Sequence, residues 1–227
     1  MTAVSVAEAV ERAAERLLYA MHNHVTVAPV RDLLGTTDIG AAYAIQQRLT
    51  RSWEQAGGVI VGRKIVLTSA AVQRQLNVDQ PDFGVLFADM DVSGAATIPA
   101  SSMLQARAEA EIAFVLAEDF GEGELDLTRV RSAIGYAVAA SVLVDIRVDG
   151  WDIALTDTVA DNASSGLFVL SEHRSGSTNS SRRRYGEPLR AGQIILSGAL
   201  GPLAPLRAGS TIRAEIEPLG SVSAIFT

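Results

Sequence analysis

The stretch Arg107-Ala108-Glu109-Ala110-Glu111-Ile112-Ala113-Phe114-Val115-Leu116 decides the fold, because it is an apolar strand that carries two glutamates. Residues i and i+2 of a β-strand point to the same face, so Glu109 and Glu111 lie side by side. Two like charges on one apolar face repel each other, and a buried carboxylate needs a partner. A divalent cation such as Mg²⁺ or Mn²⁺ can serve as that partner, because both ions prefer oxygen ligands.

An interpretation without metal fits this stretch equally well on its own. The strand then lies at the edge of a sheet with its acidic face in water, or Arg107 or another arginine neutralises the two glutamates. The rest of the sequence has to separate these interpretations.

The composition is that of an ordinary globular protein. The chain has 227 residues, of which 48% are hydrophobic and 20% charged, enough for one large core or two compact domains. The net charge of −7 argues against binding to nucleic-acid phosphates, so no nucleic-acid partner is expected. Without cysteine the chain has no disulfide, no thiolate nucleophile and no Cys-ligated zinc.

The apolar residues do not form a run long enough to cross a bilayer. Glu8, Glu11 and Glu15 interrupt the N-terminal stretch, which therefore differs from a basic and then apolar signal peptide. We expect a cytoplasmic protein with no membrane partner.

Helical patterns dominate the first part of the chain. Ser5 followed by Glu8 is typical of a capping box, and apolar residues then recur at helical spacing up to Met21. The same spacing predicts a second helix over 39–55. Shorter helices are predicted at 69–76 and 128–137. The predicted strands cover 59–65, 107–116, 140–144, 166–170, 193–196, 211–216 and 221–226.

This order of elements predicts an α+β fold with a mixed or largely antiparallel, barrel-like sheet, because strict βαβ alternation is missing. We divide the chain into an N-terminal helical region, 1–57, and a β-rich core, 58–227. The polar stretch 171–186 is typical of a flexible loop. Its arginines 182–184 could contact an anion, although a solvated loop is the commoner reason for such a run.

Several polar residues have both a functional and a structural interpretation. Lys64 on an apolar strand is either a buried functional cation or an edge residue whose ammonium reaches water. Asp82 follows Pro81 and can simply shape a turn. Asp161 and Asn162 can cap and turn the chain or line a site.

Histidines and serines give no sign of a hydrolytic triad. His22 and His24 lie at the predicted end of the first helix, where interaction with the helix C-terminus explains them. The sequence contains no Gly-x-Ser-x-Gly elbow, no P-loop and no His-Glu-x-x-His motif.

Five separated motifs together resemble one known family. They are Gly62–Ser69, Val78–Phe87, Glu109–Leu116, Asp157–Gly166 and Ile195–Pro202. In this order, and over most of the chain, they resemble the 2-hydroxypenta-2,4-dienoate (2-keto-4-pentenoate) hydratases of the fumarylacetoacetate hydrolase superfamily. The 4-oxalocrotonate decarboxylases are close relatives of these enzymes.

The resemblance implies a mixed β-roll or barrel core with an N-terminal helical region. It implies metal-dependent hydration of 2-hydroxypenta-2,4-dienoate to 4-hydroxy-2-oxopentanoate in the meta-cleavage catabolism of aromatic compounds. The implied cofactor is Mg²⁺ or Mn²⁺, and the implied partners are a small 2-hydroxydienoate or 2-oxo acid and further copies of the chain in a homo-oligomer.

The resemblance also implies roles for single residues. Glu109 and Glu111 are the expected metal ligands, Lys64 is expected to stabilise anionic oxygens, and Asp82 is expected to assist proton transfer. The residues expected to bind substrate are Leu67, Ser164 and Ser165.

The chain departs from the family at the metal site. Val142 stands where the family has a third metal-binding glutamate, and valine cannot bind a cation. Asp145 is a possible substitute, although three residues along a strand place it on the opposite face. Two carboxylates and water can still hold Mg²⁺, but more weakly.

Two further departures affect the surroundings. Arg63 replaces an aromatic residue and Val66 replaces a glycine, and the stretch Ser171–Tyr185 replaces a longer segment of the family. The sequence therefore leaves three functions open: a hydratase with full or impaired activity, a decarboxylase of the 4-oxalocrotonate type, and a non-catalytic homologue that retains the fold.

Overall fold

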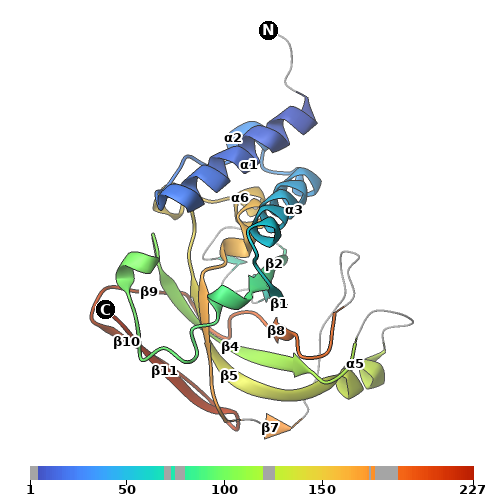
Figure 1. The fold of residues 1–227 in the computed structure, drawn as a ribbon, viewed down its shortest axis with the longest axis vertical. Helices are drawn as coiled ribbons and strands as arrows, with labels where there is room; N and C mark the ends of the chain where they lie inside the picture. Colours follow the sequence, from blue (N-terminus) through green and yellow to red (C-terminus); the bar gives the residue numbers. More distant parts are fainter. Residues whose placement is uncertain (1–4, 69–72, 75–79, 120–125, 174, 177–188) are drawn as a thin grey trace.

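The computed structural model describes residues 5–68, 73–74, 80–119, 126–173, 175–176 and 189–227. The N-terminal helices and the helix Leu155–Ala160 gather at one end of the molecule, above a long curved sheet, whereas the helix Leu127–Ala133 lies at the tip of the two longest strands (Figure 1). The predicted helix at 69–76 and the arginines 182–184 lie almost entirely outside the described residues. Within the described ranges, each helix is too short or too polar to cross a membrane.

The N-terminal helices pair through their apolar faces. Ser5 caps the first helix, and its side chain accepts a hydrogen bond from the backbone N–H of Glu8 at 3.2 Å. Leu17 from the first helix and Ile45 from the third are fully buried in one core. The helices are α1 (Val6–Asn23), α2 (Arg31–Leu34) and α3 (Ile39–Gln55). The predicted bounds of α3 are confirmed.

The main sheet is mixed, with the strand order β2-β1-β8-β4-β5-β6. The pair β1–β8 is parallel and the other neighbours along this path are antiparallel. The strands are β1 (Ile60–Val66), β2 (Asp82–Phe87), β4 (Arg107–Leu116), β5 (Ile134–Val144), β6 (Leu167–Leu170) and β8 (Ile194–Leu196). The short strands β7 (Ser175–Gly176) and β9 (Ala204–Pro205) pair with β5 and β4.

The main sheet separates two apolar cores. On one face, Ala113 and Val142 join the residues of α1 and α3. On the other face, Phe114 packs in a core shared with a small sheet of order β10-β11-β3. The strands of this sheet are β3 (Thr97–Ile98), β10 (Ser210–Ile216) and β11 (Gly220–Phe226). The expected α+β fold with a mixed sheet and an N-terminal helical region is confirmed.

One predicted helix is too long. We expected it over 128–137, but α5 (Leu127–Ala133) ends four residues earlier and 134–137 begin β5. Ala137 pairs with Phe114 and is fully buried, so pairing with β4 overrides the local helix propensity here. The short helices after it are η3 (Asp149–Trp151), α6 (Leu155–Ala160) and η4 (Asn162–Ser164).

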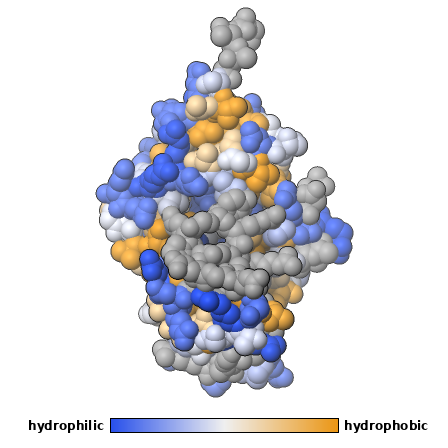
Figure 2. Space-filling model, turned by 90° about the vertical axis from the view of Figure 1, so that its right-hand side faces the viewer, coloured by the Kyte–Doolittle hydropathy of each residue, from blue (hydrophilic) through white to orange (hydrophobic). Residues whose placement is uncertain are grey.

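The surface does not identify an oligomer interface. On the face seen in Figure 2, hydrophobic residues form separate patches among hydrophilic ones. Large exposed hydrophobic side chains lie on several elements, among them Tyr19 on α1, Leu127 on α5 and Ile225 on β11. The expected homo-oligomer stays a prediction.

Candidate active site

The two glutamates of β4 are buried inside the sheet. β4 lies between β8 and β5, so the interpretation as an edge strand is wrong. Glu109 is 4% exposed and Glu111 is 0% exposed. Arg107 does not neutralise them, because its guanidinium stacks 4.0 Å from the ring centroid of Trp151.

Only one of the four glutamate oxygens has a hydrogen-bond partner within the described ranges. Glu111 Oε2 accepts the backbone N–H of Gly198 at 2.7 Å, whereas Glu111 Oε1 and both oxygens of Glu109 accept none. Gly198 has a φ of +92°, and a Cβ there would lie 2.2 Å from Oγ1 of Thr68. Glycine at this position therefore lets the backbone approach Glu111.

Lys64 and Asp82 are buried on the neighbouring strands. Lys64 lies on β1 between β2 and β8 and is 0% exposed, so the interpretation as an edge lysine is wrong. Its Nζ has no hydrogen-bond partner among the residues that the structure describes. Asp82 begins β2, pairs with Val66 and is also 0% exposed.

The charges of these side chains act on one another. Burial raises the pKa of Asp82 to about 6; the Lys64 charge opposes this rise and the Glu109 charge adds to it. Burial and the Glu109 charge raise the pKa of Glu111 well above its ordinary value, and Lys64 again opposes the rise. The three carboxyl groups of Asp82, Glu109 and Glu111 thus outnumber the single ammonium group of Lys64 in this buried cluster.

These observations fit a divalent cation and an anionic ligand. Buried polar atoms are almost always hydrogen-bonded in proteins, so a cluster of unpaired ones indicates a missing partner. The unpaired buried side-chain atoms within the described ranges are Lys64 Nζ, Asp82 Oδ1, Glu109 Oε1, Glu109 Oε2 and Glu111 Oε1. Glutamate oxygens suit Mg²⁺ or Mn²⁺, and the lysine ammonium suits an oxyanion.

A third carboxylate is missing beside this pair. Val142 lies directly opposite Glu109 in the β4–β5 ladder and is 2% exposed. Asp145 does not replace it, because its carboxylate accepts the backbone N–H groups of Leu104 at 2.9 Å and Gln105 at 2.7 Å. The described residues contain no group of three side chains that could hold a metal ion.

Ser164 is joined to Asp82 through a residue that the sequence did not single out. Thr158 Oγ1 donates to Asp82 Oδ2 at 3.2 Å and lies 3.0 Å from Ser164 Oγ. Because Thr158 gives its proton to Asp82, the Ser164 hydroxyl donates to Thr158. Thr158 lies in the motif Asp157–Gly166, and its place in that motif was the sequence feature that could have identified it as a site residue.

The other two residues expected to bind substrate lie at special backbone positions. Leu67 follows β1 directly, is 1% exposed and has a φ of 60°. The Ser165 hydroxyl donates to the backbone oxygen of Asn162 at 2.5 Å, so it stabilises the turn before it. Among the described residues, no hydrogen bond joins Ser165 to Lys64, Asp82, Glu109 or Glu111.

Arg63 and Val66 stand beside the cluster on β1. Val66 is buried opposite Asp82, which agrees with the expectation that it affects the site. The guanidinium of Arg63 donates to the backbone oxygen of Gly62 at 3.0 Å.

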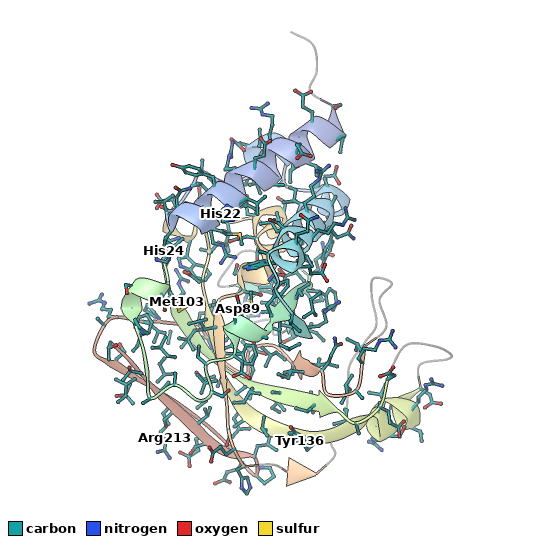
Figure 3. All side chains as sticks on the ribbon, viewed as in Figure 1. His22, His24, Asp89, Met103, Tyr136 and Arg213 are labelled. Carbon is teal, nitrogen blue, oxygen red and sulfur yellow. The ribbon has the colours of Figure 1, made fainter. Side chains whose placement is uncertain are left out.

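A cavity of about 210 Å³ lies between α1 and the main sheet, apart from the cluster. Its lining includes His24, Asp89 and Met103, which Figure 3 shows between the helical region and the sheet. Arg147 and Ser165 form part of its wall, but Lys64, Asp82 and the two glutamates do not line it. We therefore assign the candidate active site to the buried cluster.

Sequence comparison finds relatives along the whole chain, although no family model matches it. The TodF product hydratase of Pseudomonas putida is 42% identical over 96% of this chain and 95% of its own length. The 2-keto-4-pentenoate hydratase 1 of Dechloromonas aromatica is 40% identical over 95% of this chain and 96% of its own length. The 2-keto-4-pentenoate hydratase of Burkholderia vietnamiensis is 41% identical, with coverages of 94% and 96%.

Solved structures share the fold at lower identity. The 4-oxalocrotonate decarboxylase from Pseudomonas putida G7, complexed with magnesium and adipate, has a TM-score of 0.85 at 24% identity over 100% of both chains. Fumarylpyruvate hydrolase from Pseudomonas aeruginosa, in complex with Mn²⁺ and pyruvate, has a TM-score of 0.50 at 13% identity over 73% of this chain and 89% of its own. The chain therefore belongs to the 2-keto-4-pentenoate hydratase family of hydro-lyases, and it has a fold of the fumarylacetoacetate hydrolase type.

Proposed function

We propose that the protein catalyses the hydration of 2-hydroxypenta-2,4-dienoate to 4-hydroxy-2-oxopentanoate in the meta-cleavage catabolism of aromatic compounds. The observation that carries the proposal is the set of unpaired buried atoms on Lys64, Asp82, Glu109 and Glu111. Relatives about 40% identical along nearly the whole chain are named for this reaction, which supports the same substrate here.

Glu109 and Glu111 would hold the divalent cation, Mg²⁺ or Mn²⁺. When bound, this cation supplies Lewis-acid stabilisation of negative charge on the carboxylate and the 2-oxygen of the substrate. The unpaired glutamate oxygens make the two residues suitable ligands. With Val142 beside them, the protein contributes fewer carboxylates than Mg²⁺ usually needs for tight binding, so we infer a weak site.

Lys64 would stabilise the anionic oxygens of the substrate. Its ammonium is buried, so its attraction for an oxyanion is little screened by water. Its neighbours on β2 and β8 hold the strand in the interior of the sheet, which fixes the ammonium before substrate binds. Lys64 thereby compensates negative charge that develops as the enol loses its proton.

Asp82 would move the proton. It accepts the proton of the 2-hydroxyl group on its free oxygen Oδ1, while Oδ2 is held by Thr158. Protonation of the substrate at C5 then gives a conjugated 2-oxo-3-enoate, and water adds its hydroxyl to C4 and a proton to C3. The sum of these steps is the addition of one water molecule, with no net change of charge or oxidation state.

Direct turnover tests this proposal. The folded protein with Mg²⁺ or Mn²⁺ should remove the ultraviolet absorbance of freshly generated 2-hydroxypentadienoate, and mass spectrometry should identify 4-hydroxy-2-oxopentanoate. Glu109→Gln, which keeps the shape of the side chain, is the matched control and should lose most of the activity. A rate equal to that of buffer with metal would refute the proposal.

The same experiment separates the two alternatives. When the vinylogous 2-oxo diacid is offered instead, a decarboxylase releases CO₂, whereas a hydratase does not. A non-catalytic homologue changes neither substrate.

A further inference from the structure

Three consecutive residues beside the candidate site have a left-handed backbone. Asn162, Ala163 and Ser164 have φ values of 53°, 54° and 52°. This conformation is unfavourable for residues that carry a Cβ, and a run of three is unusual. All three residues are buried, so the surrounding structure has to hold the turn in place.

Arg147 holds both ends of this turn. Before the turn, its Nε donates to Asp161 Oδ1 at 2.6 Å and its backbone N–H donates to Asp161 Oδ2 at 2.8 Å. Its Nη2 donates to the backbone oxygen of Asp161, and its Nη1 donates to that of Ser165 after the turn, both at 3.0 Å. One buried guanidinium thus bridges the residues that flank the turn on either side.

The turn also contacts the strand that carries Asp82. The side-chain amide of Asn162 makes two hydrogen bonds with Val85 on β2: its oxygen accepts the backbone N–H at 2.8 Å, and its nitrogen donates to the backbone oxygen at 2.9 Å. A Cβ on Gly84 would lie 2.7 Å from the backbone oxygen of Asn162. The turn and β2 therefore pack in direct contact.

The last residue of the turn reaches Asp82 through hydroxyl groups. Ser164 Oγ lies 3.0 Å from Thr158 Oγ1, which donates to Asp82 Oδ2 at 3.2 Å. This chain fixes one carboxylate oxygen and leaves Oδ1 unpaired. A change in the turn would therefore rotate or release the carboxyl group of Asp82.

We propose that Arg147 is a positioning residue, which holds the turn 162–164 so that Ser164 and Thr158 orient the carboxyl group of Asp82. This inference rests on the proposed function, because it assigns Asp82 the transfer of a proton. Arg147 itself touches no reacting atom. It acts on the chemical step through the turn.

Kinetics of two matched pairs of variants test the proposal. Arg147→Met removes the bridge, and we expect kcat to fall by about a hundredfold, since a displaced reacting group costs that much. The Michaelis constant and the Mg²⁺ affinity should change much less, because neither substrate chelation nor the glutamates depend on the turn. Arg147→Lys should recover part of kcat, because an ammonium can still donate to Asp161.

The second pair removes the hydroxyl without disturbing the arginine. Thr158→Val has nearly the same shape but cannot donate to Asp82. It should lower kcat by about tenfold, which is less than the contribution of an acid–base group itself, because Thr158 only orients Asp82. Thr158→Ser should restore most of the rate. Because this pair leaves the buried ion pair intact, it keeps the proposal testable even where the Arg147 variants fail to fold.

Hydrogen exchange measures the turn itself. In Arg147→Met, the backbone amides of Val85 and Asp145 should exchange faster, since both donate to the turn in the wild type. Ile212→Ala weakens the apolar core that the main sheet shares with the small sheet, and it serves as the control for general destabilisation. That control should leave both amides protected and kcat unchanged.

The outcomes separate the two levels of inference. If the wild type does not turn over the dienoate, the proposed function falls, and unchanged exchange at Val85 and Asp145 in Arg147→Met would overturn the positioning role as well. If the wild type is active and Thr158→Val and a folded Arg147→Met keep its kcat, the turn does not position Asp82.

Discussion

Glu109 and Val142 lie directly opposite each other on β4 and β5, so the nearest cross-strand neighbour of a buried glutamate is apolar. Both oxygens of Glu109 lack a partner among the described residues, and Val142 offers none. Under the proposed function, the pair leaves Glu109 without a third carboxylate beside it, so we expect the site to bind a cation weakly.

Introducing a carboxylate at this position should strengthen the site. Val142→Glu places a third carboxylate beside Glu109, and we expect Mg²⁺ affinity to rise by about tenfold or more. Val142→Gln has the same size without the charge and is the control. Titration calorimetry checks both variants. Equal affinities in the Glu and Gln variants would show that the missing carboxylate does not limit metal binding.

The pH dependence of turnover should report Asp82. Burial raises its pKa to about 6, so the carboxyl group is mostly protonated below that pH and ionised above it. Since the ionised form accepts the proton of the substrate, kcat/KM should fall by about tenfold per pH unit as the pH drops below about 6. Asp82→Asn should lower the rate and abolish this acid limb. If kcat/KM of the variant still decreased below about pH 6 in the same way, another group would be responsible for this pH dependence.

The ion pair Arg147–Asp161 should contribute strongly to stability. Both residues are buried, and removing one partner leaves an uncompensated charge. Arg147→Met should therefore lower the free energy of unfolding by about 3–5 kcal/mol in urea titrations at pH 7.5. Arg213→Met breaks the exposed ion pair with Glu215 on β10, where Figure 3 labels Arg213. This variant should lower the free energy of unfolding by less than about 1 kcal/mol. Similar losses in both variants would contradict this account.

The free energy of unfolding at acidic pH should also depend on Asp161. Burial raises its pKa from 3.8 to about 6 despite the opposing charge of Arg147. The folded state therefore binds a proton more tightly than the unfolded state, and this residue's contribution to stability increases as pH falls from about 6 to 4. Asp161→Asn should lack that contribution. The measurement is the urea midpoint of unfolding of both proteins between pH 4 and 6. A difference between the two midpoints that stays constant over this range would show that Asp161 does not titrate there.

The amino-acid pattern was sufficient to predict β4 and the shared face of its glutamates, but it did not predict β2, because Asp82 after Pro81 looked like part of a turn. In a β-strand the alternation in 107–116 places both glutamates on the same face, and β4 has the predicted bounds. Whether that strand lay at an edge depended on pairing with β8, which follows it by almost 80 residues, and local periodicity does not encode such a contact. The same limit applies to Lys64, whose burial results from pairing on both sides.

The polar residues around the turn were the hardest to predict. Asp161 and Asn162 were candidates for turn chemistry, but their partners Arg147 and Val85 come from distant segments. Thr158 was not singled out, because its role depends on the position of Asp82 on another strand. Helix 128–137 was predicted too long because alanine favours helices, whereas burial between strands favoured β5.

Metal titration tests the central claim most directly. The claim is that Glu109 and Glu111 share one divalent cation. Calorimetry with Mn²⁺ should give one site per chain in the wild type, and Glu109→Gln or Glu111→Gln should each weaken it by about tenfold or more, since each removes a charged ligand. Circular dichroism should first establish that the variants are folded. Affinities that remain equal to that of the wild type in both variants would contradict the account.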